Sequence, residues 1–164
     1  MNLASHETIT QLNPISVYHS PQSQGMTEFY NYLNLFLFMK ITFYGGAREV
    51  TGANYLLETQ RAKVLVDCGM FQGNREFDEL NFKPFAYNPA DIDALCVTHA
   101  HIDHVGRIPK LVADGFHGRI ISTPATRDLA RVLLEDAMRL EQREDRVLFS
   151  PKDLDRTSEL WEGL

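Results

Sequence analysis

A short apolar segment, Ala94–Thr98 (ALCVT), is followed at once by a hexad with the sequence His-Ala-His-Ile-Asp-His, residues 99–104. After the hexad, Val105–Ala113 has apolar side chains at helical spacing. A buried strand, a tight polar loop and a helix form the repeating unit of α/β proteins. This arrangement therefore predicts an α/β fold with a functional site in the loop between the strand and the helix.

The hexad carries four side chains of the kind that bind metal ions: His99, His101, Asp103 and His104. Alternate residues of an extended segment point the same way, so His99 and His101 can face one ion. Asp103 and His104 lie at the turn into the helix and face a second position. A polar loop whose histidines cap the helix is the alternative, but three histidines and a carboxylate at this spacing favour a metal site. The mixed imidazole and carboxylate donors predict zinc, with manganese or iron as alternatives.

The chain from Lys40 onward is punctuated by turn residues at regular intervals. Three short strands in an antiparallel arrangement are predicted first, at Lys40–Tyr44, Asn54–Glu58 and Lys63–Val66. A later strand at Arg119–Ser122 precedes a long helix that Thr123 caps and Pro124 begins. The spacing of its apolar residues predicts one buried face, made of Leu129, Val132, Leu133, Ala137 and Leu140. Ser150, Pro151 and Asp153 begin another helix, which we expect to continue to the C-terminus.

The first part of the sequence differs in charge from the rest. The chain has 16 basic and 22 acidic residues, a net charge of -6, yet no lysine or arginine precedes Lys40. We therefore predict that residues 1–38 are an extension outside the fold. The apolar stretch Phe29–Met39 falls short of the ~20 residues needed to span a bilayer and lacks the basic region of a signal peptide. No membrane association is expected.

The segment Thr98–Pro109 (THAHIDHVGRIP) carries the HxHxDH signature of the metallo-β-lactamase superfamily. Three further segments resemble its β-CASP branch, the RNA-processing nucleases related to the eukaryotic pre-mRNA 3′-end endonuclease: Gly45–Leu57 (GGAREVTGANYLL), Val64–Gly73 (VLVDCGMFQG) and Gly118–Leu129 (GRIISTPATRDL). The resemblance covers Met39 to the end of the chain. It implies an α/β fold of the metallo-β-lactamase type, an αββα sandwich, of which residues 39–164 are the N-terminal part.

The resemblance also implies a role for each matched residue. In this family a water or hydroxide bridges two zinc ions. His99 and His101 match the ligands of the first zinc, and Asp103 and His104 match those of the second. Asp103 is then also the catalytic group that orients the attacking water or takes its proton. Asp67 matches an acidic residue of the catalytic site that supports the histidines without binding metal itself.

The activity implied by the resemblance is hydrolysis of an RNA phosphodiester bond, with endo- and exonuclease action both open. The family takes further metal ligands from later in the chain, and none is matched here, because His117 lies in a turn too early in the sequence. The chain is therefore expected to be catalytically incomplete. Two alternatives stay open, namely hydrolysis of a small ester, thioester or lactone by the same site, and an inactive truncated product.

Two groups of residues near the motifs are less informative. Cys68 and Cys96 lie in apolar, strand-like runs, as expected of reduced thiols in a cytoplasmic protein. Cys68 adjoins Asp67, and we expect it to be a small buried residue rather than a metal ligand. Four arginines flank the motifs: Arg48, Arg75, Arg107 and Arg127. Contact with RNA phosphates is one expectation for them, and on an acidic chain a position in solvent is at least as expected.

Overall fold

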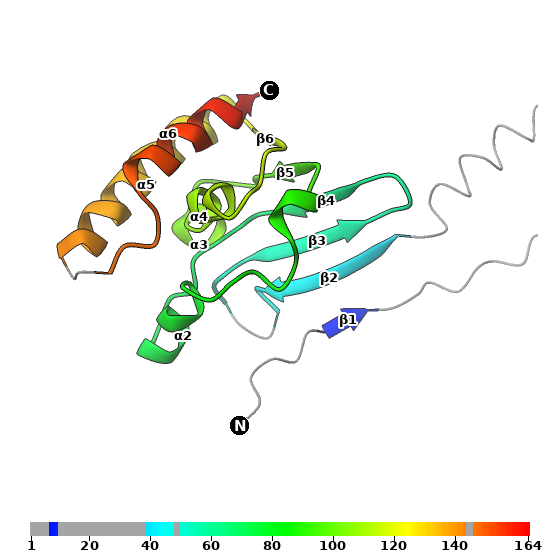
Figure 1. The fold of residues 1–164 in the computed structure, drawn as a ribbon, viewed down its shortest axis with the longest axis horizontal. Helices are drawn as coiled ribbons and strands as arrows, with labels where there is room; N and C mark the ends of the chain where they lie inside the picture. The colour runs from blue at the N-terminus through cyan, green and yellow to red at the C-terminus, as the bar shows by residue number, and fades with distance from the viewer. Residues whose placement is uncertain (1–6, 10–38, 48–49, 144–145) are drawn as a thin grey trace, which may run out of the picture.

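The computed structural model describes residues 7–9, 39–47, 50–143 and 146–164. Its described strands form one sheet in the order β1 to β7, so each strand lies beside its neighbours in sequence (Figure 1). The strands are β1 (Glu7–Ile9), β2 (Lys40–Gly45), β3 (Asn54–Glu58), β4 (Lys63–Val66), β5 (Ala94–Cys96), β6 (Arg119–Ser122) and β7 (Trp161–Gly163). The α-helices are α2 (Arg75–Leu80), α3 (Ile102–Val105), α4 (Ile108–Ala113), α5 (Pro124–Arg143) and α6 (Pro151–Leu160), with a 3₁₀ turn, η1, at Pro89–Asp91.

The sheet changes character at β4. Strands β1 to β4 pair antiparallel, whereas β4 to β7 pair parallel. Strands β2, β3 and β4 follow one another without an intervening helix, while the parallel strands are joined by crossovers that contain the helices. The carboxyl ends of β4 and β5 therefore lie at the same edge of the sheet, and this edge carries the residues predicted to form the site.

One face of the sheet is covered and fully buried. A register row across the strands contains only buried side chains, at Thr42, Leu56, Leu65, Leu95 and Ile120. Residues of α4, α5 and α6 join the same core, among them Leu111, Leu134 and Leu154. Burial of these side chains is the main favourable contribution to the folding of this layer.

The opposite face of the sheet is apolar but lacks a covering layer among the described residues. The adjacent register row contains Phe43, Tyr55, Val66, Cys96 and Ile121. Cys96 is exposed, and the other four are only half-buried. A sheet with two apolar faces needs a layer on each side. This is what half of an αββα sandwich looks like, so the predicted fold class, with only part of the fold present, is confirmed.

Residues 1–38 are predicted to lie outside the fold, and most of them are not among the residues that the structure describes. Within that range the structure describes β1, which pairs with Ile41 to Phe43 of β2. No described helix is both long and apolar enough to cross a membrane.

The three antiparallel strands and the strand at Arg119–Ser122 match their predicted positions to within a residue, whereas two helix predictions need correction. The helix predicted over 105–113 is two short helices, α3 and α4, because the ring of Pro109 would clash with the carbonyl of Val105 in a continuous helix. The last helix does have the predicted Ser150–Asp153 capping box, but it ends at Leu160. Trp161 then begins β7, where its indole Nε1 donates to Ser122 Oγ at 2.9 Å.

The buried face predicted for α5 is only partly right, because Leu133 and Ala137 are half-buried but the other three residues are exposed. Leu129, Val132 and Leu140 are 53%, 61% and 53% exposed, whereas Ala130 and Leu134 are fully buried. The helix has apolar residues on two sides, and the sequence pattern favoured the side that carries more of them. Helix α5 contacts α3, α6 and β7, and the side that carries Ala130 and Leu134 belongs to the core.

Helix α2 lies between β4 and β5, where no helix is predicted from the sequence. Asn74 caps it, since its side-chain Oδ1 accepts from the backbone N–H groups of Glu76 and Phe77 at 3.0 and 3.1 Å. Glu76 and Asp78 in the first turn favour a helix start through the helix dipole. These cap and charge signals were present in the sequence, but a helix of six residues shows little apolar periodicity.

Candidate metal centre

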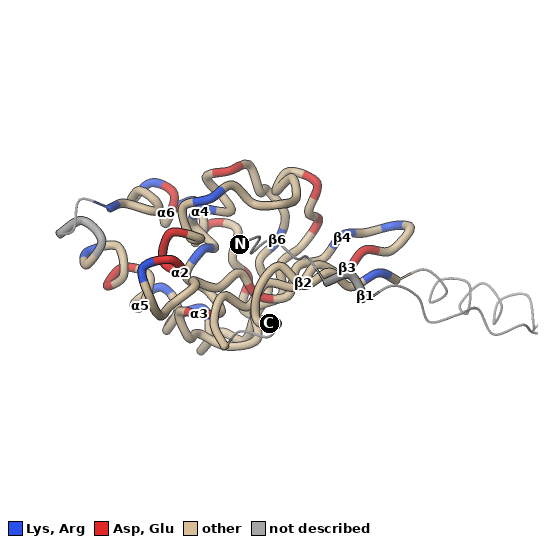
Figure 2. Tube along the Cα trace, turned by 90° about the horizontal axis from the view of Figure 1, so that it is seen from below, with Lys and Arg blue, Asp and Glu red and all other residues tan. Residues whose placement is uncertain are grey.

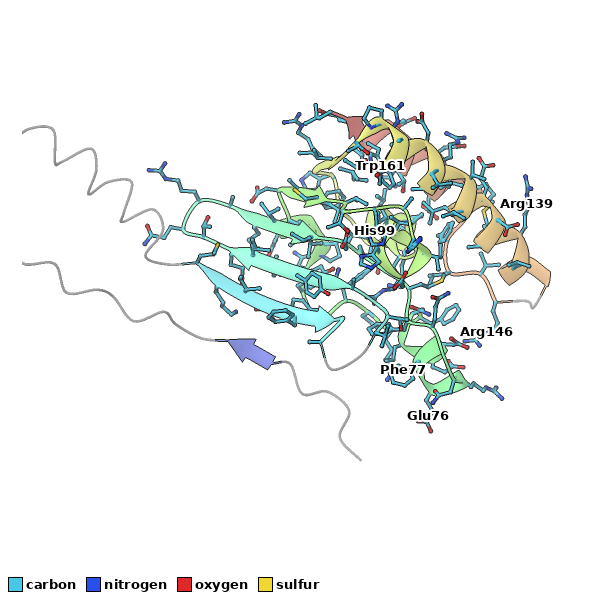
Figure 3. The ribbon with its side chains drawn as sticks, turned by 180° about the vertical axis from the view of Figure 1, so that it is seen from behind. Glu76, Phe77, His99, Arg139, Arg146 and Trp161 are labelled. Carbon is cyan, nitrogen blue, oxygen red and sulfur yellow. The ribbon has the colours of Figure 1, made fainter. Side chains whose placement is uncertain are left out.

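The site lies at the edge where β4 and β5 end side by side. Asp67 follows β4 directly, and the backbone N–H of Asp67 donates to the Cys96 carbonyl at the end of β5, at 2.9 Å. Two residues, Val97 and Thr98, separate the end of β5 from the hexad, which continues into α3. His99 lies between the strands and the helices (Figure 3). The parallel pairing of these two strands thus brings together residues 37 positions apart in the chain.

Backbone hydrogen bonds fix the loop after Asp67 against the hexad. The N–H groups of Cys68 and Met70 donate to the carbonyls of His104 and Ile102 at 2.8 and 3.0 Å. Gly69 lies between them, and a Cβ at this position would come within 1.6 Å of the Asp103 carbonyl oxygen. Only glycine therefore allows the two backbones to approach this closely.

Asp67 is the buried centre of the site. It is 1% exposed, and its φ of 59° lies in the left-handed region that non-glycine residues rarely adopt. Its Oδ1 accepts from the backbone N–H of Thr98 at 2.8 Å. Its Oδ2 is 2.8 Å from both the Thr98 hydroxyl and His104 Nδ1. A buried carboxylate needs such partners, and this one binds both ends of the segment 98–104.

The first donor pair consists of His99 and His101. Nε2 of His99 and Nδ1 of His101 are 3.2 Å apart. Two nitrogens that bind one tetrahedral zinc ion lie about 3.3 Å apart, given the length of a Zn–N bond. The spacing of these two nitrogens, one from each ring, is thus compatible with binding to a single ion.

The second donor pair consists of His104 and Asp103. Nε2 of His104 is 3.7 Å from the Asp103 carboxylate oxygen Oδ2, and the Nδ1 of the same ring is occupied by Asp67. The three rings lie together, with centroids 4.7 Å apart for His99 and His101 and 4.0 Å apart for His99 and His104. Within the described part of the chain, no three His, Cys, Asp or Glu side chains surround one point as a complete metal site would. The donors instead form two adjacent pairs.

The structure thus brings together all five residues predicted from the sequence: Asp67, His99, His101, Asp103 and His104. Their assignment as ligands and catalytic groups rests on the proposal below. His117 lies apart, exposed in its turn with Nδ1 3.1 Å from the Gly115 carbonyl oxygen. Cys68 is fully buried, and burial raises the pKa of its thiol to about 11, which keeps it protonated at neutral pH.

Two residues beside the site differ from what the sequence predicts, because no role is predicted for Thr98 and Arg107 is expected to contact RNA phosphates or solvent. Thr98 contacts both Asp67 and His99, which the residue type alone could not indicate. Arg107 is only 5% exposed, and its guanidinium carbon lies 4.6 Å from the ring centre of Phe71, so this arginine does not face RNA or solvent. Of the other flanking arginines, Arg127 pairs with Asp128, whereas Arg48 lies outside the described residues.

Comparison with known proteins identifies relatives of the chain. Residues 47–162 match the sequence profile of the Metallo-beta-lactamase superfamily. Ribonuclease TTHA0252 of Thermus thermophilus is 45% identical over 117 residues, which are 71% of this chain and 26% of that protein. Transcription termination factor FttA of Methanosarcina mazei is 37% identical over 115 residues, 67% of this chain and 17% of that protein.

A solved metallo-beta-lactamase structure from Cronobacter sakazakii is also similar, with a TM-score of 0.39 and 24% identity over 54% of this chain and 30% of that one. The chain spans about a quarter or less of the length of the two curated relatives. The fold of this superfamily implies that a divalent metal ion is bound. Since the profile covers most of the chain, the protein belongs to the metallo-beta-lactamase superfamily and, with these relatives, to its β-CASP branch.

Proposed function

We propose that this chain supplies the metal-binding half of a zinc-dependent hydrolase that cleaves RNA phosphodiester bonds. The observation that carries the proposal is the pair of donor sets, His99 with His101 and Asp103 with His104, held by one buried carboxylate. Relatives named as a ribonuclease and as transcription termination factors support a substrate of the RNA class. Manganese and iron suit the same donors and are the alternatives to zinc.

Each residue has a distinct part in this proposal. His99 Nε2 and His101 Nδ1 hold one ion, and Asp103 and His104 Nε2 hold the second. Ions held by these residues would activate a water for attack and would offset the negative charge of the phosphate. The Asp103 carboxylate orients the attacking water and accepts its proton. Asp67 accepts from His104 Nδ1, which leaves Nε2 of that ring free to bind the ion.

The surface charge indicates how RNA would bind. Acidic and basic residues are interspersed along the described chain, and the whole chain carries a net charge of -6 (Figure 2). We propose that the reacting phosphate is recognised mainly through its contact with the metal centre.

Metal binding is the first test. The 164-residue chain is titrated with zinc in competition with a chromophoric chelator, and the His101→Ala variant is the comparison. We expect the chain to bind zinc and the variant to lose most of that affinity, because one of the two donors to the first ion is removed. Asp114→Asn, which changes an exposed carboxylate away from the hexad, is the matched control and keeps the wild-type affinity. Equal affinity in all three proteins contradicts the site.

Substrate class is the second test. The intact protein is assayed with single-stranded RNA, with S-lactoylglutathione and with a lactone. Cleavage of RNA alone supports the proposal, whereas turnover of the thioester or lactone alone supports the small-ester alternative. The 164-residue chain by itself is expected to cleave no RNA, and His101→Ala then changes nothing in that assay. RNA cleavage by the short chain that disappears in His101→Ala contradicts the proposed incompleteness.

A further inference from the structure

The hydroxyl of Thr98 lies between the buried carboxylate and the first metal-binding histidine. It is 2.8 Å from Asp67 Oδ2 and 3.0 Å from His99 Nδ1. The backbone N–H of the same residue donates to Asp67 Oδ1 at 2.8 Å. Thr98 is thus attached to both oxygens of one carboxylate and is also in contact with the imidazole that follows it in the chain.

The direction of these hydrogen bonds follows from the number of protons available. A threonine hydroxyl has one hydrogen, and a carboxylate can only accept, so this hydrogen belongs to the contact with Asp67. The hydroxyl oxygen then has lone pairs left for His99. The 3.0 Å contact is therefore a hydrogen bond from His99 Nδ1–H to Thr98 Oγ1. A charged acceptor strengthens the first bond, which in turn makes the hydroxyl oxygen a better acceptor for the second.

We propose that Thr98 is a positioning residue that fixes His99 as the tautomer with its proton on Nδ1, so that the bare Nε2 faces the first metal position. This inference rests on the proposed metal site and adds a residue to it. It explains why Nε2, not Nδ1, is the nitrogen of His99 that lies 3.2 Å from His101. Asp67 then orients two histidines, His104 by direct contact and His99 through Thr98.

An exposed hydroxyl can be replaced by water, and Thr98 is exposed. Two features make the protein contact persist. The hydrogen bond from the Thr98 backbone N–H to Asp67 holds the Thr98 backbone in place independently of its side chain. Asp67 is itself buried. The hydroxyl consequently needs only one rotamer to bridge the two groups, and no long flexible side chain has to be ordered.

The experiment compares Thr98→Val with Thr98→Ser in the 164-residue chain. Valine keeps the shape and removes the hydroxyl, whereas serine keeps the hydroxyl. Long-range ¹H–¹⁵N NMR spectra of metal-free protein report which nitrogen of His99 carries the proton. We expect the Nδ1–H form in the wild type and in Thr98→Ser, and a shift toward the Nε2–H form, which neutral imidazole prefers in water, in Thr98→Val.

Zinc affinity, measured by chelator competition, gives the second readout. We expect Thr98→Val to bind zinc about tenfold more weakly or worse, and Thr98→Ser to restore the wild-type affinity. An unchanged tautomer in Thr98→Val overturns the inference, as does a serine variant that binds as weakly as the valine variant. Neither readout depends on RNA cleavage, so failure of the proposed activity leaves this result interpretable. Amide spectra that match the wild type show that both variants are folded.

Discussion

Replacing Gly69 by alanine tests the close contact on which the whole site depends. The added Cβ would lie 1.6 Å from the Asp103 carbonyl oxygen and 2.7 Å from the His104 nitrogen, so the two backbones must separate by about 1.4 Å to reach an ordinary contact of 3.0 Å. Such a shift breaks the bonds from Cys68 to His104 and from Met70 to Ile102, and strains the bond from the Ala53 N–H to the Asp103 carbonyl. At about 1 kcal/mol for each bond, we expect a loss of about 3 kcal/mol in the free energy of unfolding.

Urea denaturation measures this loss, with the fluorescence of the single tryptophan, Trp161, as the signal. Gly115→Ala is the matched control. Its backbone φ of 114° strains any other residue, but the nearest atom to the new Cβ would be 3.9 Å away, so it lacks the clash and costs only about 1 kcal/mol. Zinc affinity should fall in Gly69→Ala and stay unchanged in Gly115→Ala. The reasoning is refuted if both variants lose the same stability and both keep wild-type zinc binding.

Four further predictions concern individual residues. Leu134→Ala should lower the free energy of unfolding by about 2–5 kcal/mol, whereas Leu129→Ala on the exposed side of α5 should change it by less than about 0.5 kcal/mol; equal losses would contradict the assigned face. A thiol reagent at pH 8 should modify Cys96 and spare Cys68 until urea unfolds the chain. Because the folded-state pKa of Cys68 is raised to about 11, its contribution to stability is complete below pH 9 and is lost as the pH rises toward 11, which denaturation midpoints in that range will show. Asp67→Asn should weaken zinc binding about 10- to 100-fold, and an unchanged affinity would rule out its role in orienting His104.

The strands and the position of the site could be predicted because their signals are local. Lys63–Val66 and Arg119–Ser122 are short apolar runs bounded by turn residues, and the structure has strands at both places. Helix α5 shows the opposite case. Periodicity alone does not show which side of α5 is buried, because that depends on the contacts of the helix with α3, α6 and β7, which lie elsewhere in the chain.

The same distinction applies to the site. The donor pairs can be predicted because their four residues lie within six consecutive positions. Asp67 lies more than thirty positions before the hexad, and its role is indicated by the resemblance to the family. The contact of Thr98 with Asp67 spans 31 residues and depends on the parallel pairing of β4 and β5. Likewise, the burial of Arg107 results from packing against Phe71 and Phe85. Threonine and arginine have no sequence pattern that marks them for such positions.

The sequential order of the strands has a consequence for the folding pathway. Strands β2 to β5 each pair with the strand that precedes them in the sequence. The two donor pairs and Asp67 all lie between the end of β4 and the end of α3. Residues 67–93 connect β4 to β5. The entropy lost on closing this connection is limited, because the cost of loop closure rises only slowly with loop length. The metal-binding loop can therefore assemble during synthesis, as soon as β5 docks on β4 and before β6, α5, α6 and β7 have left the ribosome.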